Sequence, residues 1–169
     1  MPVARVFDDA HMIKPLPNAL HEQFADDWQV VGHGVFSWSV FRVYRIALHA
    51  IGAYGDGATF ALDLNYLRNV SAQQITEASV QEMQRICGIE AGVLQVWATE
   101  LLEILPDVTL GDRLIGVFVP TQGVWFFDAE HSLGSIEDPL FCEAFSAIWL
   151  DPKTRATKLR AALLGEFEA

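Results

Sequence analysis

Side chains able to do acid–base or anion-binding chemistry occur in this chain inside strongly apolar stretches, not in a recognisable catalytic motif. They lie in the second and third apolar runs of the sequence: Arg42, Tyr44, Arg45, His49, Tyr66 and Arg68. A guanidinium near the buried face of a sheet is costly unless paired, so it often holds an anion or a structural carboxylate. In a second interpretation, Arg42 and Arg45 reach solvent at a sheet edge or pair with Asp63. The tyrosines either fill the core or offer hydroxyls to a ligand in a cleft.

The motifs of nucleotide, metal and covalent chemistry are absent from the sequence. Gly32-His33-Gly34 lacks the rest of a dinucleotide-binding loop. The histidines are dispersed, so a metal site would need ligands from separate elements. Neither Cys87 nor Cys142 has a neighbouring histidine, and no serine lies in a nucleophile elbow. We therefore expect no metal, no cofactor and no catalytic nucleophile.

Composition argues against several classes of partner. The formal charge of −11, with 11 scattered Lys and Arg, provides no basic surface for a phosphate backbone, so nucleic acid is not expected. No apolar run approaches the roughly 18 residues of a membrane-spanning helix. The N-terminus lacks a basic segment followed by an apolar one, which predicts a cytoplasmic protein, with the periplasm as the alternative. Cys87 and Cys142 are then expected to be reduced and partly buried. No pattern in the sequence indicates an oligomeric state.

The 169 residues, 51% of them hydrophobic, are enough for one domain with a substantial core. We expect that domain over residues 28–169, preceded by an extended N-terminal arm over residues 1–27 with a helical turn near Leu20 to Phe24. Apolar patterns give the order strands, two helices, strands, two helices. Because strands and helices do not alternate, the sequence predicts an α+β fold with a mainly antiparallel sheet.

Residue patterns also predict the individual elements of the first half of the chain. Strands are expected over 28–38 and 40–51, and a third over 59–66, where apolar and polar residues alternate as in a sheet with one solvent-exposed face. Ser71 with Gln74 is a capping-box pattern that starts a helix ending at Gly88. A second helix is expected over 90–105, where Pro106 stops it.

Proline and glycine divide the last third of the chain. Pro120-Thr121-Gln122-Gly123 separates two β-like runs over 114–119 and 124–127, which predicts a hairpin. Asp138-Pro139 and Asp151-Pro152 each look like an N-cap aspartate followed by proline at the first helical position. Two short helices are therefore expected to close the chain.

Several spaced motifs together resemble the bacterial chalcone isomerase-like family, over about residues 28–165. They are Trp28-Gln29-Val30-Val31-Gly32-His33-Gly34, Phe41-Arg42-Val43-Tyr44, Leu64-Asn65-Tyr66-Leu67-Arg68, the turn from Pro106-Asp107 to Gly111-Asp112-Arg113, Leu133-Gly134, and Ile148-Trp149-Leu150-Asp151-Pro152. The resemblance implies an open-faced β-sandwich, in which helices cover one face of a large antiparallel sheet and leave an apolar cleft. In the plant enzymes of this family the cleft positions a flavonoid precursor whose phenolate adds across an enone, and related noncatalytic members are fatty-acid-binding or accessory proteins.

The catalytic groups of the plant enzymes do not carry over to this sequence. The position of the family's arginine falls on Val35 or Phe36, its tyrosine near Ile75, its asparagine near Glu82, and its third-helix hydroxyl near Ile148. Tyr44 alone offers a hydroxyl, near the family's strand threonine. Losing one donor to a developing oxyanion typically costs about 2.7–4 kcal/mol, and here several are missing together. An efficient isomerase is therefore not expected, and Glu82 is expected to be a solvated surface charge.

Three functions remain open from the sequence. The leading hypothesis is noncatalytic binding of a hydrophobic small molecule such as a fatty acid, in a cleft lined by Val35, Phe36, Arg42, Tyr44, Tyr66, Ile75, Glu82 and Ile148. The second is an isomerase or intramolecular lyase for an enone-type substrate that uses Tyr44, Tyr66 and Arg68. The third is a structural or partner-binding domain whose cleft has closed around its aromatic side chains.

Overall fold

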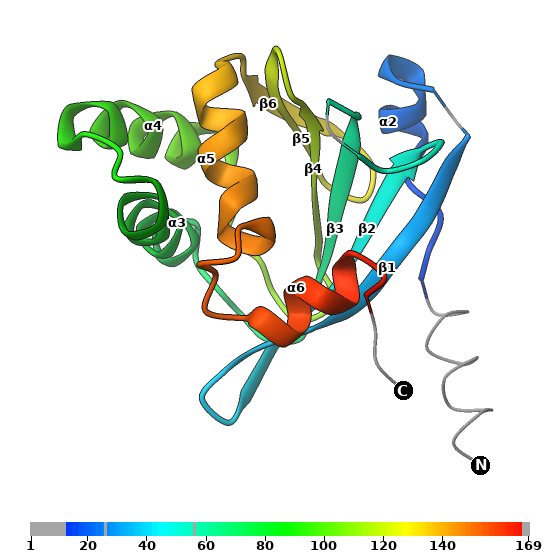
Figure 1. Ribbon diagram of the computed structural model, residues 1–169, viewed down its shortest axis with the longest axis horizontal. Coiled ribbons are helices and arrows are strands. Elements are labelled where there is room, and N and C mark those ends of the chain that lie inside the picture. Colours follow the sequence, from blue (N-terminus) through cyan, green and yellow to red (C-terminus); the bar gives the residue numbers. More distant parts are fainter. Residues whose placement is uncertain (1–12, 26, 56, 167–169) are drawn as a thin grey trace.

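The protein is built around a six-stranded sheet in which every neighbouring pair is antiparallel and the strand order follows the sequence. The computed structural model (Figure 1) describes residues 13–25, 27–55 and 57–166. The strands are β1 Trp28–Trp38, β2 Phe41–Ile51, β3 Phe60–Tyr66, β4 Arg113–Val119, β5 Gly123–Phe127 and β6 Ser132–Ile136. The helices are α2 Asn18–Gln23, α3 Ala72–Cys87, α4 Ala91–Ile104, α5 Pro139–Leu150 and α6 Thr157–Leu163. The predicted α+β fold with an antiparallel sheet is confirmed.

Local capping signals fix several helix ends where the sequence predicted them. The Ser71 hydroxyl accepts a hydrogen bond from the Gln74 N–H (3.1 Å), and the Gln74 side chain accepts one from the Ser71 N–H (2.9 Å). Gly88 ends α3 with φ of 65°, a conformation that favours glycine. The Asp138 carboxylate accepts a hydrogen bond from the Leu140 N–H (2.9 Å) at the start of α5. These interactions involve near neighbours, which is why the sequence reveals them.

The second aspartate–proline pair does not start a helix, and this prediction is wrong. Helix α5 ends at Leu150, and the Asp151 N–H still donates to the Ala147 carbonyl. The Asp151 carboxylate instead accepts a hydrogen bond from the Lys153 N–H (2.8 Å), and α6 begins only at Thr157. Proline is also common just after a helix end, so the same pair fits a stop. Strand β6 was not predicted, because Ser132-Leu133-Gly134-Ser135-Ile136 carries little β propensity.

Helices α3, α4, α5 and α6 form a layer on one face of the sheet. Helix α5 packs on β4 and β5, α6 packs on β1 and β2, and α3 contacts α4 and α5 (Figure 1). The contact between α6 and β1 is close, because a Cβ added at Gly32 would lie 2.0 Å from the Ala162 carbonyl oxygen. Aromatic rings fill the space beneath α5: Phe145 stacks on Phe118 and on Phe141, and contacts Trp149 edge-on.

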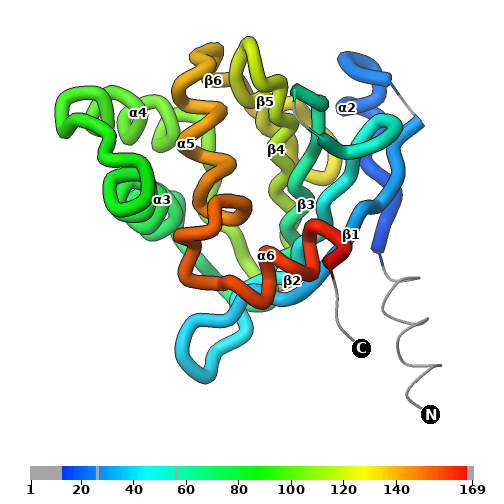
Figure 2. Tube along the Cα trace, viewed as in Figure 1, coloured from blue at the N-terminus to red at the C-terminus, as the bar shows by residue number. Residues whose placement is uncertain are grey.

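The opposite face of the sheet, called the back face below, is not the solvent-exposed face that the alternation in β3 predicted. Ala61 and Asp63 on that face are 0% and 1% exposed. Leu16 and Leu20, from the chain before β1, form a second buried cluster there with Ala61, Ile115, Val117 and Phe127. Figure 2 shows α2 and the segment before it on the side of the sheet away from α5. Alternation correctly divides the side chains between two faces, but it does not report what covers each face. Residues 1–12 and 26 of the predicted arm lie outside the described residues.

Candidate functional site

Three of the sequence-predicted site residues meet in an aromatic cluster at one end of the sheet. The Phe36 ring stacks on Tyr44 at 4.9 Å between centroids, and Tyr44 contacts Tyr66 edge-on at 5.4 Å. The Trp149 indole N–H donates a hydrogen bond to the Tyr44 hydroxyl (2.8 Å). Burial raises the pKa of both tyrosine hydroxyls, so both are neutral at ordinary pH. Aromatic side chains therefore occupy the region where the sequence predicted ligand contacts.

The other predicted residues are more scattered. Val35 pairs with Arg45, whereas Phe36 pairs with Tyr44, so Val35 and Phe36 face opposite sides of the sheet. Ile75 on α3 and Ile148 on α5 are partly buried and pack against the core that contains Tyr44.

Two of the arginines near this end of the sheet are at the surface. Arg42 is exposed, and Arg68 is exposed with its guanidinium 4.3 Å from the centre of the Phe41 ring. Tyr44 and Tyr66 meet in the core, but Arg68 does not join their hydroxyls. The geometry therefore gives no support to Tyr44, Tyr66 and Arg68 as a catalytic set.

Glu82 belongs to a surface ion cluster. Its carboxylate accepts hydrogen bonds from Arg85 on the same helix (2.8 Å from Nη2) and from Arg155 beyond α5 (3.2 Å from Nε). The hydrogen bond from Arg85, aided by Arg155, outweighs partial burial and lowers the pKa of Glu82. The side chain thus ties α3 to the connection between α5 and α6, and at 19% exposure its carboxylate is paired with two arginines rather than freely solvated.

An open, largely apolar pocket of about 470 Å³ lies beside the first half of α5, next to the start of β3 and the β4–β5 turn, and we call it the α5 cavity. Its lining is Phe60, Pro120, Pro139, Leu140, Cys142, Glu143 and Ser146. Burial raises the pKa of the Cys142 thiol to about 11, so this side chain behaves as a small neutral group. Phe60 and Tyr66 are the two ends of β3, roughly 20 Å apart along the strand, so the cavity and the aromatic cluster are at opposite ends of the sheet.

The described residues that line the α5 cavity include none of the predicted site residues. The residue that could have indicated this cavity from the sequence is Leu140, a large apolar residue directly after the Asp138-Pro139 cap. In the structure it is 46% exposed. An apolar side chain at the first turn of a helix is common, however, so this signal is weak on its own.

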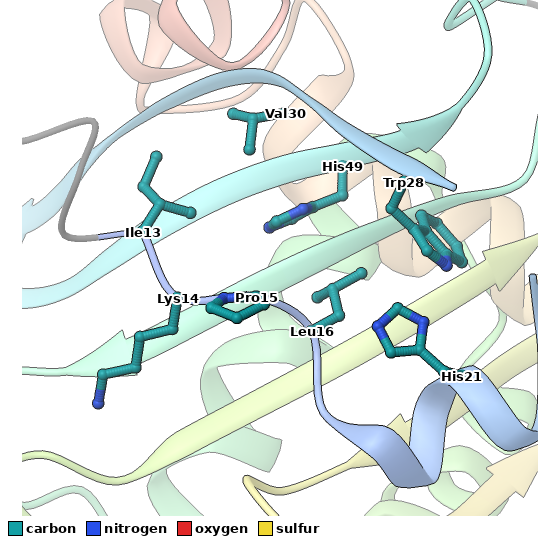
Figure 3. Close-up of a pocket in the computed structure, with 8 residues that line it drawn as sticks. All are labelled: Ile13, Lys14, Pro15, Leu16, His21, Trp28, Val30 and His49. Atoms are coloured by element: carbon teal, nitrogen blue, oxygen red, sulfur yellow. The ribbon is translucent and has the colours of Figure 1, made fainter. Parts of the chain in front are cut away.

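A second pocket, of about 320 Å³, lies on the back face and is called the back-face pocket. Figure 3 shows its lining, which comes from the segment before α2, from α2 and from β1 and β2: Ile13, Lys14, Pro15, Leu16, His21, Trp28, Val30 and His49. His49 is 4% exposed. Sequence analysis singled out His49 as a polar residue in a strand but did not associate it with the N-terminal segment.

A buried ion pair lies beside this pocket and anchors its wall. Arg113 donates from Nε and Nη2 to the two carboxylate oxygens of Asp63, both at 2.8 Å. The Nη2 atom also donates to the backbone carbonyls of Pro15 (3.0 Å) and Lys14 (3.3 Å). Asp63 therefore pairs with Arg113, so the alternative in which it pairs with Arg42 or Arg45 is wrong, whereas Arg42 is exposed as the other alternative expected. The partners are 50 residues apart in sequence, so no local pattern links them.

Two opposing effects act on the Asp63 carboxyl. Burial raises its pKa, but the hydrogen bonds and charge of Arg113 outweigh burial, with help from the His49 imidazole, and the net pKa is lowered. The His49 Nε2 atom is 3.6 Å from Asp63 Oδ2, too far for a strong hydrogen bond, so Arg113 is the dominant partner. Asp63 is thus a carboxylate whose charge is already neutralised.

Within the described residues, no group of three or more His, Cys, Asp or Glu side chains is arranged to hold a metal ion. Nor does any described helix have the length and apolar character needed to cross a membrane. Both described cysteines, exposed Cys87 and buried Cys142, are free thiols.

Residues 22–165 match the family model described as chalcone isomerase-like, which accounts for the sheet, the helix layer and their order. This chain belongs to the chalcone isomerase-like family. An uncharacterized protein of Haemophilus influenzae is 27% identical to this chain over 144 residues, which are 82% of this chain and 69% of that protein. The fold is shared with the crystal structure of a fatty-acid binding protein of Arabidopsis thaliana, with a TM-score of 0.68 and 12% identity over 85% of this chain and 89% of that one.

Proposed function

We propose that this member of the chalcone isomerase-like family is a noncatalytic protein that binds an apolar small molecule between its sheet and its helices. The observation that carries the proposal is the α5 cavity of about 470 Å³, which falls within the range of roughly 300–1,000 Å³ typical of small-molecule sites. Its position beside α5 and the sheet agrees with the cleft expected for the family. The aromatic cluster fills the other end of the space between the sheet and the helices, and the α5 cavity lies at the opposite end of the sheet.

The chemistry of the lining favours a neutral ligand or a neutral part of one. Phe60, Leu140 and two prolines supply apolar surface, and the Cys142 thiol is neutral. None of the described residues that line the cavity is Lys, Arg or His, whereas Glu143 is a carboxylate there. Glu143 is exposed at the pocket, and a ligand carboxylate placed beside it would be repelled, so a fatty acid would direct its head group away from Glu143 towards solvent and leave its chain inside. The fatty-acid binding protein of similar fold supports this ligand class.

The sequence-predicted residues support the noncatalytic part of the proposal. The Tyr44 hydroxyl is engaged by the Trp149 indole, and its surroundings are aromatic rings rather than positioned donors. Catalysis of the family type requires several donors or cations aimed at one oxygen. The aromatic cluster therefore acts as packed core, and the binding function is assigned to the α5 cavity.

The proposal is tested by isothermal titration of decanol and decanoate against the purified protein and two variants. Leu140→Trp should fill the cavity mouth, and Leu102→Trp is the matched control, because Leu140 and Leu102 are 46% and 48% exposed on different helices. We expect saturable binding, tighter for decanol than for decanoate. Leu140→Trp should weaken it about tenfold or more, equivalent to at least ~1.4 kcal/mol, and Leu102→Trp should not. Absence of saturable binding by either ligand, or equal effects of the two variants, would contradict the proposal.

A further inference from the structure

The back-face pocket contains a buried imidazole nitrogen that the protein itself leaves unsatisfied. His49 Nε2 is inaccessible to solvent and has no hydrogen-bond partner among the described residues, and Asp63 Oδ2 at 3.6 Å is beyond hydrogen-bond reach. A buried polar atom without a partner is costly in a folded protein, and such atoms are few. Because His49 also lines the pocket, a turn of its imidazole ring would bring this nitrogen to a ligand there, which can supply the missing partner.

The hydrogen-bond donors around this pocket favour an anion. Lys14, His21 and His49 contribute basic side chains from three different elements, and no Asp or Glu is among the described lining residues. Asp63, whose Oδ2 lies 3.6 Å from His49 Nε2, is already held by Nε and Nη2 of Arg113. This basic lining contrasts with the formal charge of −11 on the whole chain. A carboxylate that enters the pocket would therefore meet donors rather than repelling charges.

The remainder of the lining is apolar and includes one aromatic ring. Ile13, Leu16 and Val30 line the pocket together with the Trp28 indole, and Figure 3 shows Trp28 on one side of His49 and Ile13 on the other. The volume of about 320 Å³ suits a small ring system rather than a long acyl chain. The Arg113 hydrogen bonds to the carbonyls of Lys14 and Pro15 fix this wall against the sheet, so the pocket is largely preformed.

We propose that the back-face pocket is a second binding site, specific for a small aromatic carboxylate. The ring packs against Trp28 and Leu16, and the carboxylate accepts hydrogen bonds from an N–H of the His49 imidazole and from Lys14. This site lies across the sheet from the α5 cavity and uses none of its residues. The two proposals are therefore independent of each other.

The test compares naphthylacetate with its neutral analogue naphthylacetamide by calorimetry on the full chain. We expect the acid to bind at least tenfold more tightly than the amide, because charge-assisted hydrogen bonds are lost with the amide. His49→Gln and Lys14→Met should each weaken binding of the acid roughly ten- to a hundredfold. Lys153→Met, which removes an exposed lysine after α5, is the matched control and should leave binding unchanged.

Two further variants distinguish loss of the binding site from loss of the fold. Lys14 is exposed, so Lys14→Met keeps the fold and tests the proposal even if His49→Gln unfolds. Leu140→Trp should retain naphthylacetate binding, which distinguishes this site from the α5 cavity. The proposal is overturned if the acid and the amide bind equally, if neither binds, or if Lys14→Met and Lys153→Met behave alike.

Discussion

Replacing Arg113 by methionine should destabilise the protein far more than replacing both Arg113 and Asp63. The two side chains are 8% and 1% exposed and form two parallel hydrogen bonds of 2.8 Å. Arg113→Met leaves the Asp63 carboxylate buried without its partner, which typically costs about 3–5 kcal/mol. That is a large share of the roughly 5–15 kcal/mol that stabilises an ordinary domain.

In the double variant Arg113→Met with Asp63→Leu, no buried charge is left behind. Exchanging a buried ion pair for apolar side chains of similar volume is often close to neutral. Arg113 also donates to the carbonyls of Lys14 and Pro15, however, so those hydrogen bonds are still lost. At about 1 kcal/mol for each net hydrogen bond, the double variant should be about 1–2 kcal/mol less stable than the wild type.

Urea unfolding followed by circular dichroism measures these free energies, and hydrogen exchange reports on the segment before β1. Exchange should rise in residues 13–24 of both variants, because both lose the anchor of that segment. The reasoning is refuted if Arg113→Met costs less than about 1 kcal/mol, or if the double variant costs as much as the sum of the two single variants. Either result would mean that the pair is not the dominant electrostatic contact of this face.

The same pair predicts an acid response. The Asp63 pKa is lowered in the folded protein, so its stabilising contribution is present above the ordinary carboxyl pKa of about 3.9. That contribution is lost as the pH falls through the lowered folded-state pKa. Stability should therefore fall less steeply below about pH 4 in the double variant than in the wild type, which urea titrations at several pH values measure.

Two further substitutions test the packing of the helix layer. Gly32→Ala should destabilise the protein by about 1–3 kcal/mol or more, because its Cβ would lie 2.0 Å from the Ala162 carbonyl oxygen. Gly55→Ala is the control, because a Cβ there meets nothing within 4 Å. The thermal unfolding of the two variants should differ clearly, and equal values would refute the close contact of α6 with β1. Tyr44→Phe should cost about 1–3 kcal/mol in urea unfolding by leaving the Trp149 indole N–H without an acceptor, and a neutral effect would show that this hydrogen bond contributes little.

Sequence patterns alone determined most of the local structure. The strand over 28–38, the capping box at Ser71, the glycine that ends α3 and the cap at Asp138 all depend on residues within a few positions of one another. Backbone preferences and side-chain caps act over that range, so they can be read without a fold. Spaced motifs added the family resemblance, and with it the architecture of the sheet and its helices.

Only the tertiary structure decided which face of the sheet is covered and where the pockets lie. The Asp151-Pro152 pair fits both a helix start and a helix end, and the path of the following chain selects the end. Asp63 and Arg113 meet across adjacent strands although 50 residues separate them, and Leu16 and Leu20 bury a face that alternation alone would leave to solvent. Burial and pairing depend on which distant segments pack together, and the free energy of that packing is a property of the whole chain rather than of any local stretch.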